Sequence, residues 1–337
     1  MSHWLTLDEV EDVSRRMLTT AGASALQSDA TARSIRDAEA EGIRTVGLSY
    51  LPTYCDHVAC GKVDGHAVPT VSRPRPGTVV VDAHLGFCHP AYEAGEAPLV
   101  EATRANGIGL LVLQHSYSAG VLGWFVDRLA RQGLVALMFA NSSALMAPHG
   151  GVRPFFGTNP IAWAAPRLDG PPVVADLSSS AVAWVAVNAA AQRGEAIPLG
   201  WALDADGNPT TDPHAALAGS MAPSGGHKGS ALALLVDVLG GGVAGSKFSH
   251  EAGSFGGTAG GPPDVGQVVL AIDPQVAAGG DVVARFEHEF RALAAEPGVR
   301  LPGDRRVAAR SDAEQRGVEV DDELFAVLTR YAEVGPS

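Results

Sequence analysis

The spacing of hydrophobic positions predicts helices at both ends of the chain. Val10, Val13 and Met17 recur at helical intervals in a first helix, and a second helix is expected over residues 28–41. A third helix is expected to follow Gly47 and to end at Gly61. Amphipathic stretches at 282–295 and 321–331 predict further helices. We therefore expect an amino-terminal helical segment, residues 1–75, that packs with carboxy-terminal helices within residues 282–337.

The middle of the chain alternates short apolar runs with helical patterns, which is typical of an α/β core. Strands are expected at 78–82, 110–113, 134–140, 173–176 and 268–272, and helices at 98–106 and 118–132. The core is expected to extend over residues 76–281. Within it, the glycine-rich stretch 240–266 predicts a mobile loop.

Composition limits the class of protein and of partner. The 337 residues are 46% hydrophobic and 18% charged, as in globular proteins with a packed core. The net charge of −13 argues against the basic surface that binding to nucleic acid or to an anionic membrane needs. Three cysteines, no apolar run long enough to span a bilayer and no export signal predict a cytoplasmic protein without a disulfide framework.

The segment Pro223-Ser-Gly-Gly-His-Lys-Gly229 has the features of an anion-binding site. It opens an apolar helix, so the glycines expose backbone N–H groups at a helix N-terminus, and His227 and Lys228 add side-chain donors. In a chain of net charge −13, this segment is the natural place for a phosphate or pyrophosphate. The alternative interpretation is a glycine turn with a solvated lysine.

Three other segments are weaker candidates. Asp176-Leu-Ser-Ser-Ser180 delivers a carboxylate and three hydroxyls from a strand to a helix start, where one serine could simply cap the helix. The string Gly240-x-Gly-x-x-Gly245 matches a dinucleotide fingerprint, but no helical pattern follows it. Cys55 and Cys60 flank His57 at a spacing that a metal could use, although their register fits the buried face of a helix better. No metal site is expected.

Three motifs, which follow one another in the order typical of the family, resemble the type-2 malate/L-lactate dehydrogenase family. That family includes ureidoglycolate dehydrogenases, diketogulonate reductases and cyclic-imine reductases. The three motifs are Gly157-Thr-Asn-Pro160, the run from Gly200 to Pro213, and Pro223-x-Gly-Gly-His-Lys-Gly229. The similarity extends to the Leu301-Pro-Gly-Asp-Arg305 stretch. The resemblance implies a non-Rossmann α/β fold with a mixed sheet, NAD or NADP as cofactor, and a homodimer.

The resemblance also assigns residues to the cofactor. The positions expected to contact the dinucleotide are Ser116, Ser118, Gly120, Thr158, Asn159, Asp176, Ser178, Ser179, Ser180, His227, Lys228, Gly229 and Arg305.

The chain departs from the family pattern at four functional positions. The family's Ser-His-Gly-x-x-Arg motif, which supplies the proton donor and the carboxylate-binding arginine, has Val46 and Tyr50 at those two places. Ser118 replaces a histidine, and Val185-Ala186 replaces a Gly-Lys pair. Valine cannot transfer a proton, and tyrosine cannot form a bidentate salt bridge. If the third helix begins by Thr45, Val46 and Tyr50 lie on one helical face toward the substrate; otherwise Tyr50 packs in the core.

Two functions of different class remain open. The first is an NAD(P)H-dependent reductase of a larger, weakly anionic ketone or imine, as in a biosynthetic tailoring step, with its proton donor among Tyr50, Tyr117, His115 and His149. The second is a non-redox descendant: a cyclase, isomerase or lyase, or a protein that binds without turnover.

Overall fold

A seven-stranded sheet forms the centre of the molecule in the computed structural model, which describes residues 2–278 and 280–336. Among the neighbouring strands, β3 and β4 run parallel and the other pairs run antiparallel, so the sheet is mixed, as predicted. Its strands lie in the order β2 (Thr70–Arg75), β3 (Thr78–Asp82), β4 (Ile108–Ser116), β11 (Val265–Ile272), β5 (Val135–Ala140), β6 (Ile161–Ala165) and β7 (Val173–Leu177).

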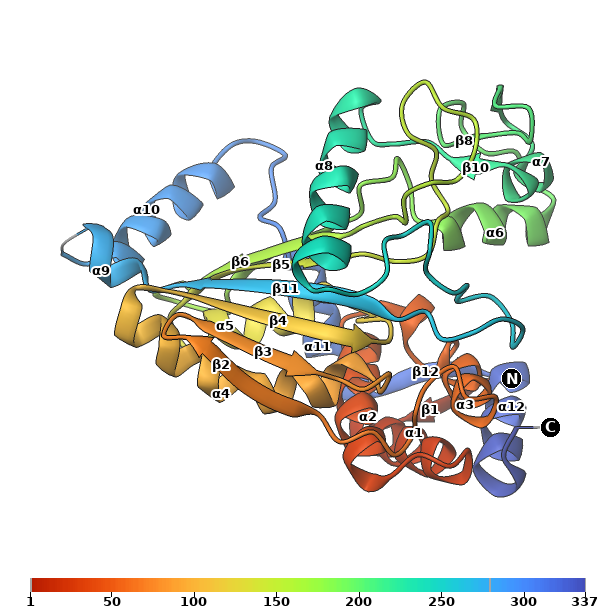
Figure 1. Cartoon of the computed structure of the whole chain (residues 1–337), viewed down its shortest axis with the longest axis horizontal. Coiled ribbons are helices and arrows are strands. Elements are labelled where there is room, and N and C mark those ends of the chain that lie inside the picture. Colours follow the sequence, from red (N-terminus) through yellow and green to blue (C-terminus); the bar gives the residue numbers. More distant parts are fainter. Residues whose placement is uncertain (1, 279, 337) are drawn as a thin grey trace.

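The main core lies between this sheet and two helices on one of its faces, α4 (Cys88–Asn106) and α5 (Leu122–Ala130) (Figure 1). Alternate residues of β3 and β4 point into it, and the rings of Tyr92 and Phe125 fill the space against them. The other face of the sheet carries α8 (His227–Asp237) and the π-helical turn that continues it, Val238–Val243.

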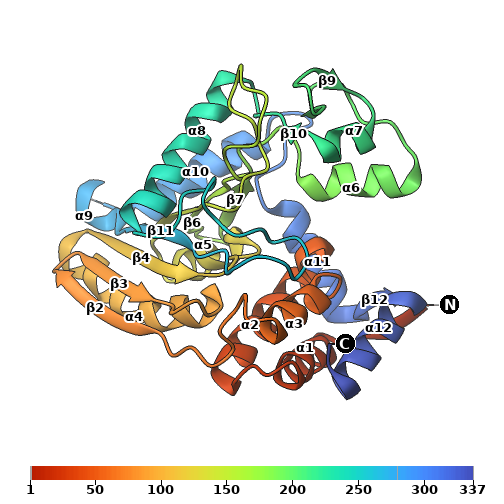
Figure 2. The ribbon, with the colours of Figure 1, turned by 45° about the vertical axis from the view of Figure 1, so that its right-hand side comes forward.

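Both ends of the chain build one unit beside the sheet. Strand β1 (Ser2–Leu5) pairs antiparallel with β12 (Val318–Asp321), and the N- and C-terminal ends lie near each other (Figure 1). The helices of this unit are α1 (Leu7–Thr20), α2 (Ala25–Ala40), α3 (Leu51–Ala59), α11 (Asp304–Arg316) and α12 (Asp322–Val334) (Figure 2). The sequence did not predict β1, β12 or α11.

The remaining elements lie outside the central sheet. A small three-stranded sheet in the order β10 (Ser220–Met221), β8 (Ala202–Leu203) and β9 (Pro209–Thr210) packs with helices α6 (Trp184–Arg193) and α7 (Pro213–Ala218). Helices α9 (Pro274–Ala278) and α10 (Val282–Ala294) project at the opposite end (Figure 1). None of the helices in the described residues is long and apolar enough to cross a bilayer.

The prediction for the third helix was wrong at its start. Residues Arg44–Val46 form a separate 3-10 turn, Gly47 leaves the helical conformation with φ −94° and ψ −136°, and α3 begins only at Leu51. Pro52 is favoured in this first turn because it has no N–H to pair. Val46 and Tyr50 therefore do not share a helical face. Tyr50 is the N-cap residue of α3 and packs, partly buried, against the core cluster of the terminal unit, as in the alternative interpretation.

Three further boundaries differ from prediction. Helix α4 begins at Cys88, ten residues before the predicted start at Pro98. The proline lies inside the helix, which tolerates the lost backbone hydrogen bond because it packs against the sheet. The helix predicted over 118–132 is shorter, since Gly120 has φ +62° in the turn that precedes it. The stretch predicted as a loop over 240–266 begins with the π-helical turn and ends in β11.

Candidate functional site

The predicted anion-binding segment forms an open helix N-terminus. Gly226, with φ +63°, is the N-cap residue of α8, and no side chain caps the helix there. His227 and Lys228 are exposed on the first turn, and among the described residues no group hydrogen-bonds or ion-pairs with the Lys228 ammonium. The backbone N–H groups of Gly226, Lys228, Gly229 and Ser230 donate to nearby backbone carbonyls, so this segment offers a phosphate the positive end of the helix and the free Lys228 ammonium.

The serine segment runs beside this helix start. Ser224 N donates to Ser179 O at 2.9 Å, and a Cβ at Gly229 would lie only 2.4 Å from Ser224 O and 2.8 Å from Ser179 O. Gly229 is thus required for the close approach of the two segments. The structure brings the predicted positions 178–180 and 227–229 together.

Most of the serine hydroxyls and their neighbours bind backbone groups. Ser179 Oγ donates to Asn159 O at 2.7 Å, and Ser180 Oγ donates to Val182 O at 2.7 Å. Asn159 is fully buried, with φ +36°, and its Nδ2 donates to Ala233 O at 2.9 Å on α8. Thr158 accepts from Ser179 N at 2.8 Å through its carbonyl. These residues hold the anion-binding segment in place, and half-buried Ser178 remains the hydroxyl nearest to solvent.

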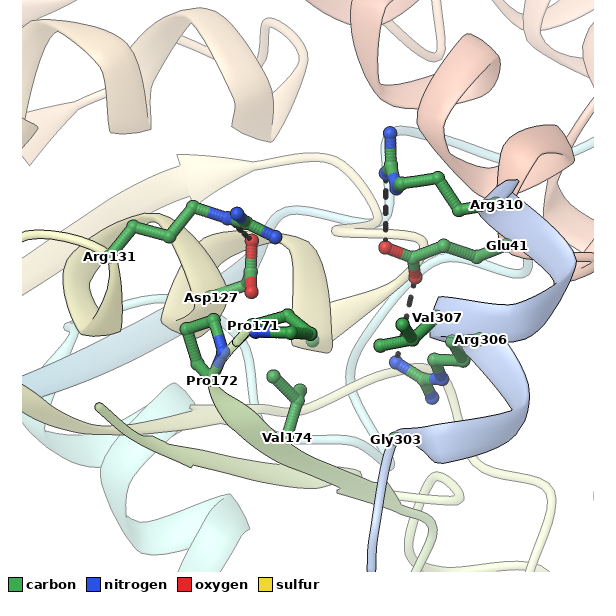
Figure 3. Close-up of a pocket in the computed structure, with 11 residues that line it drawn as sticks. Glu41, Asp127, Arg131, Pro171, Pro172, Val174, Gly303, Arg306, Val307 and Arg310 are labelled. Atoms are coloured by element: carbon green, nitrogen blue, oxygen red, sulfur yellow. Dashed lines mark hydrogen bonds and ion pairs between the residues drawn. The ribbon is translucent and has the colours of Figure 1, made fainter. Parts of the chain in front are cut away.

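Asp176, near the C-terminal end of β7, contacts two residues that line a cavity, Gly123 and Arg306. Its Oδ2 accepts from Gly123 N at 2.9 Å and lies 3.5 Å from Arg306 Nη2. The cavity has a volume of about 70 Å³, and arginine and acidic side chains line it (Figure 3). Most of these charges are paired, as in Arg131 with Asp127 and Arg310 with Glu41.

Of the two adjacent arginines Arg305 and Arg306, it is Arg306 that lines this cavity, whereas the predicted cofactor residue Arg305 is exposed. Arg306 Nη1 is buried and lacks a hydrogen-bond partner among the described residues, and Glu41 Oε2 lies 4.0 Å away. A buried guanidinium N–H without an acceptor fits an anionic ligand group. The orphaned Arg306 donor and the uncapped α8 N-terminus, at the two ends of the Asp176–Ser180 segment, are compatible with a phosphate-bearing dinucleotide.

The predicted turn from His115 to Gly120 connects β4 to α5. His115 Nδ1 lies 2.8 Å from Asp264 Oδ1, and its backbone N donates to Ser246 Oγ. Ser116 is buried and donates to Gln267 Oε1 at 2.6 Å, so its position does not support a cofactor contact. Ser118 Oγ accepts from Gly120 N at 3.3 Å. His149 lies far along the chain, exposed, with its ring 6.2 Å from that of His227.

The predicted donors Tyr50 and Tyr117 belong to one aromatic cluster. Tyr50 packs edge-on against Tyr54 at 4.8 Å, and Tyr117 packs against Phe255 at 5.1 Å. Phe255 comes from the glycine-rich loop, and Tyr50 Oη donates to its carbonyl at 3.4 Å. Burial raises the pKa of both Tyr50 and Tyr117, so both hydroxyls stay protonated.

Sequence reasoning missed two polar side chains beneath this cluster, His57 and Lys62, and both are fully buried. His57 Nδ1 hydrogen-bonds to Tyr117 Oη, and His57 Nε2 lies 3.0 Å from Gly257 O. Lys62 Nζ donates to Ser254 O and Gly257 O, each at 2.8 Å. His57 lies in α3 and Lys62 just after its end, and the loop carbonyls that accept from them lie about two hundred residues away, so no local pattern could identify these contacts.

The weaker sequence motifs have structural roles. The glycines of the 240–245 string lie in and after the π-helical turn, where a Cβ at Gly240 would lie 2.8 Å from Asn141 Oδ1. Cys55 is buried and Cys60 exposed, and both are free thiols. No group of three or more potential metal ligands occurs in the described part of the chain.

Comparisons with known proteins give the family. A sequence profile described as malate/L-lactate dehydrogenase matches residues 5–329. The chain is 42% identical to a (2R)-3-sulfolactate dehydrogenase (NADP(+)) of Chromohalobacter salexigens, covering 98% of this chain and 99% of that one. It is 41% identical to Delta(1)-pyrroline-2-carboxylate reductase 1 of Burkholderia ambifaria, covering 95% of each. Among solved structures, a delta1-piperideine-2-carboxylate reductase from Pseudomonas syringae superposes with a TM-score of 0.94 at 37% identity, covering 98% and 99% of the two chains.

Proposed function

Because the chain belongs to the malate/L-lactate dehydrogenase family and is an NAD(P)-dependent oxidoreductase, we propose that it reduces a ketone or imine that is larger and less anionic than the compounds named for its relatives. The relatives support the general class, a reductase of an anionic or imine substrate. The observation that carries the finer proposal is the apolar, aromatic character of the buried cluster against which half-buried Tyr50 packs.

This aromatic cluster, in which Tyr54 and Tyr117 are buried and Tyr50 and Phe255 are partly buried, differs from a carboxylate-binding site. Tyr50, Tyr54, Tyr117 and Phe255 contact one another edge-on, and half-buried Val46 packs against the main core. A carboxylate would lose hydration there without gaining a salt bridge, whereas a flat apolar group gains ring contacts. We therefore assign this cluster to the apolar part of the substrate, which suits a biosynthetic tailoring step.

The chain's own residues supply binding and orientation. The uncapped α8 N-terminus and Lys228 would hold the phosphate groups of NAD(P), and the Arg306 guanidinium would contact a further anionic or ribose oxygen near Asp176. When bound, the reduced nicotinamide supplies a hydride. The protein must then provide a proton and exclude water, and the buried hydroxyls of the aromatic cluster suit both tasks.

The test is a paired substrate comparison. The purified protein is first titrated with NADH and with NADPH by fluorescence, and nucleotide oxidation is then followed with Δ1-piperideine-2-carboxylate and with 2-phenyl-1-pyrroline, a cyclic imine without a carboxylate. We expect nucleotide binding and a higher kcat/KM for the aryl imine, with malate and lactate not oxidised. A higher kcat/KM for the carboxylate would contradict the substrate proposal, and failure to bind either nucleotide would favour the non-redox alternative.

We also propose a homodimer. Helix α8 exposes Leu232, Leu234, Leu235 and Val238, each between 45% and 52% accessible. An exposed row of large aliphatic side chains on a helix that carries an anion-binding site is best stabilised by a second copy of the chain.

A further inference from the structure

His57 contacts two hydrogen-bonding groups that fix how its protons are placed. The backbone oxygen of Gly257 can only accept, so His57 Nε2, 3.0 Å away, carries a hydrogen. In the neutral ring, Nδ1 is then the acceptor, and the Tyr117 hydroxyl must donate to it. In the protonated ring, Nδ1 donates instead, and the Tyr117 hydroxyl hydrogen is free for another acceptor. Both protonation states keep the same heavy-atom contacts.

The acceptor for Nε2 belongs to the glycine-rich loop. Gly257 O also accepts from Lys62 Nζ, which in turn donates to Ser254 O, so buried donors from and just after α3 hold the loop over the cluster. Phe255, between these two carbonyls, places its ring on Tyr117. When the loop lies in the position in which Phe255 covers Tyr117, its Gly257 carbonyl also holds the His57 ring oriented toward the Tyr117 hydroxyl.

We propose that Tyr117 is the catalytic residue that transfers the proton to the substrate, and that His57 is the positioning residue that orients and reprotonates it while the loop is closed. This inference rests on the proposed reductase function. It assigns the proton donor in a chain that has Val46 where the family resemblance places a histidine.

The hydride bonds to the ketone or imine carbon, and the π electron pair of the C=O or C=N bond moves to the heteroatom. The Tyr117 O–H bond breaks as the heteroatom takes its proton. The phenolate oxygen takes the proton from His57 Nδ1, which leaves neutral His57 with its hydrogen on Nε2. One hydride from the nicotinamide and one proton are consumed, and water restores the proton to His57 after the loop opens.

The surroundings of His57 set the direction of the pH dependence. Burial lowers the pKa of His57 below its ordinary 6.5, and the nearby Lys62 ammonium lowers it further. The Gly257 carbonyl and Asp56 act in the opposite direction. The other titratable groups facing the pair are the hydroxyls of Tyr50 and Tyr54 and the Cys60 thiol. Because reduction uses the protonated ring, its rate should rise as the pH falls through a value below 6.5.

The test uses Tyr117→Phe and His57→Gln with the aryl imine and NADPH. Tyr117→Phe keeps the ring packing and should lower kcat by about 10²–10⁴-fold, with KM and NADPH affinity nearly unchanged. His57→Gln can still accept from Tyr117 and donate to Gly257, so it should keep KM but lose the pH limb below 6.5. Tyr92→Phe is the matched control, because it removes another buried hydroxyl, one that donates to Phe125 O at 2.9 Å in the main core.

A measurement without substrate tests the pair itself. ¹⁵N NMR of His57 at neutral pH should show hydrogen on Nε2 and none on Nδ1, with the pKa of His57 changed by Tyr117→Phe and unchanged by Tyr92→Phe. A wild-type enzyme that turns over, together with a Tyr117→Phe variant of equal kcat, would overturn the proton-transfer role while leaving the reductase function intact. A wild type without NADPH binding or turnover would refute the reductase function, and hydrogen on Nδ1 would refute the pair independently of it.

Discussion

At the proposed anion-binding segment, recognition would depend on very few cations, because the protein is acidic. Lys228 is one of three lysines in a chain of net charge −13, and it lies unpaired on the first turn of α8. We expect Lys228→Ala to weaken NADPH binding by about 1.5–3 kcal/mol, the range for hydrogen bonds to charged groups. A fluorescence titration measures this, with Arg316→Ala as control because it removes an exposed cation elsewhere. Equal affinities would mean that the segment is a turn without a ligand.

Glu39 shows how a buried carboxylate couples stability to pH. It is 5% exposed and accepts from Leu48 N at 2.7 Å, and burial raises its pKa above 4.5, although that hydrogen bond and Arg44 oppose the rise. A raised pKa in the folded state means that the folded protein holds this proton more tightly than the unfolded chain does. The contribution of protonated Glu39 to the stability of the fold is therefore complete below pH 4.5, and it disappears as the pH rises through the raised pKa of the folded state.

Glu39→Gln keeps an acceptor for Leu48 N and removes the charge. We expect this variant to be more stable than wild type at pH 7, at about 1.4 kcal/mol for each unit by which the pKa is raised, and to depend less on pH above 4.5. Urea unfolding at several pH values measures it. Glu287→Gln provides the contrast, because the hydrogen bond from Arg167 at 2.8 Å lowers the pKa of Glu287 to about 2, so removing its charge should destabilise the fold at pH 7. Identical pH profiles for wild type and Glu39→Gln would contradict the prediction.

At the scale of elements, the glycine-rich loop depends on Lys62 for its position. Lys62→Met keeps the aliphatic stem but leaves Ser254 O without its donor and Gly257 O with His57 alone. We expect the loop to open more often, so that chymotrypsin cleaves after Phe255 about tenfold faster, which corresponds to about 1.4 kcal/mol. Lys247→Met is the control within the same loop, because its contact with Pro262 O is long, at 3.3 Å, and partly exposed. Equal cleavage rates in the two variants would show that Lys62 does not hold the loop.

Elements with a local signal could be predicted from the sequence, and those held by distant partners could not. Five of the seven strands of the central sheet and the glycine start of α8 follow from apolar runs and from glycine conformation, whereas β2 and β6 were not predicted. Helix α11 was missed because it is polar, and it is held by ion pairs such as Arg310 with Asp37 at 3.1 Å on α2. The start of α4 was missed because burial outweighs the cost of Pro98.

The same distinction applies to the candidate site. The anion-binding segment is contiguous, so its chemistry could be read locally, and the structure places it beside the predicted serine segment. The Tyr117–His57 pair joins residues sixty positions apart, and its third member, Gly257, comes from a loop without a distinctive side chain. Only the fold brings these groups together.

The whole molecule combines a strong negative charge with one exposed apolar helix. Two copies of net charge −13 repel each other, so association through α8 must come from apolar contact. The repulsion is screened by salt, whereas the apolar contribution is not. A dimer of this kind should therefore tighten as the ionic strength rises, opposite to an interface made of salt bridges.

The dimer prediction can be tested at one position on α8. Leu235, 45% exposed in the single chain, would be buried in the dimer, where a leucine contributes about 1.5–3 kcal/mol. Leu235→Glu removes that contribution and places two like charges in the contact, so light scattering should give a dimer for wild type and a monomer for the variant. Leu293→Glu on α10 is the matched control, because it adds the same charge at a leucine that is 43% exposed elsewhere. A wild-type monomer at all protein and salt concentrations, or a dimer that survives Leu235→Glu unchanged, would exclude α8 as the interface.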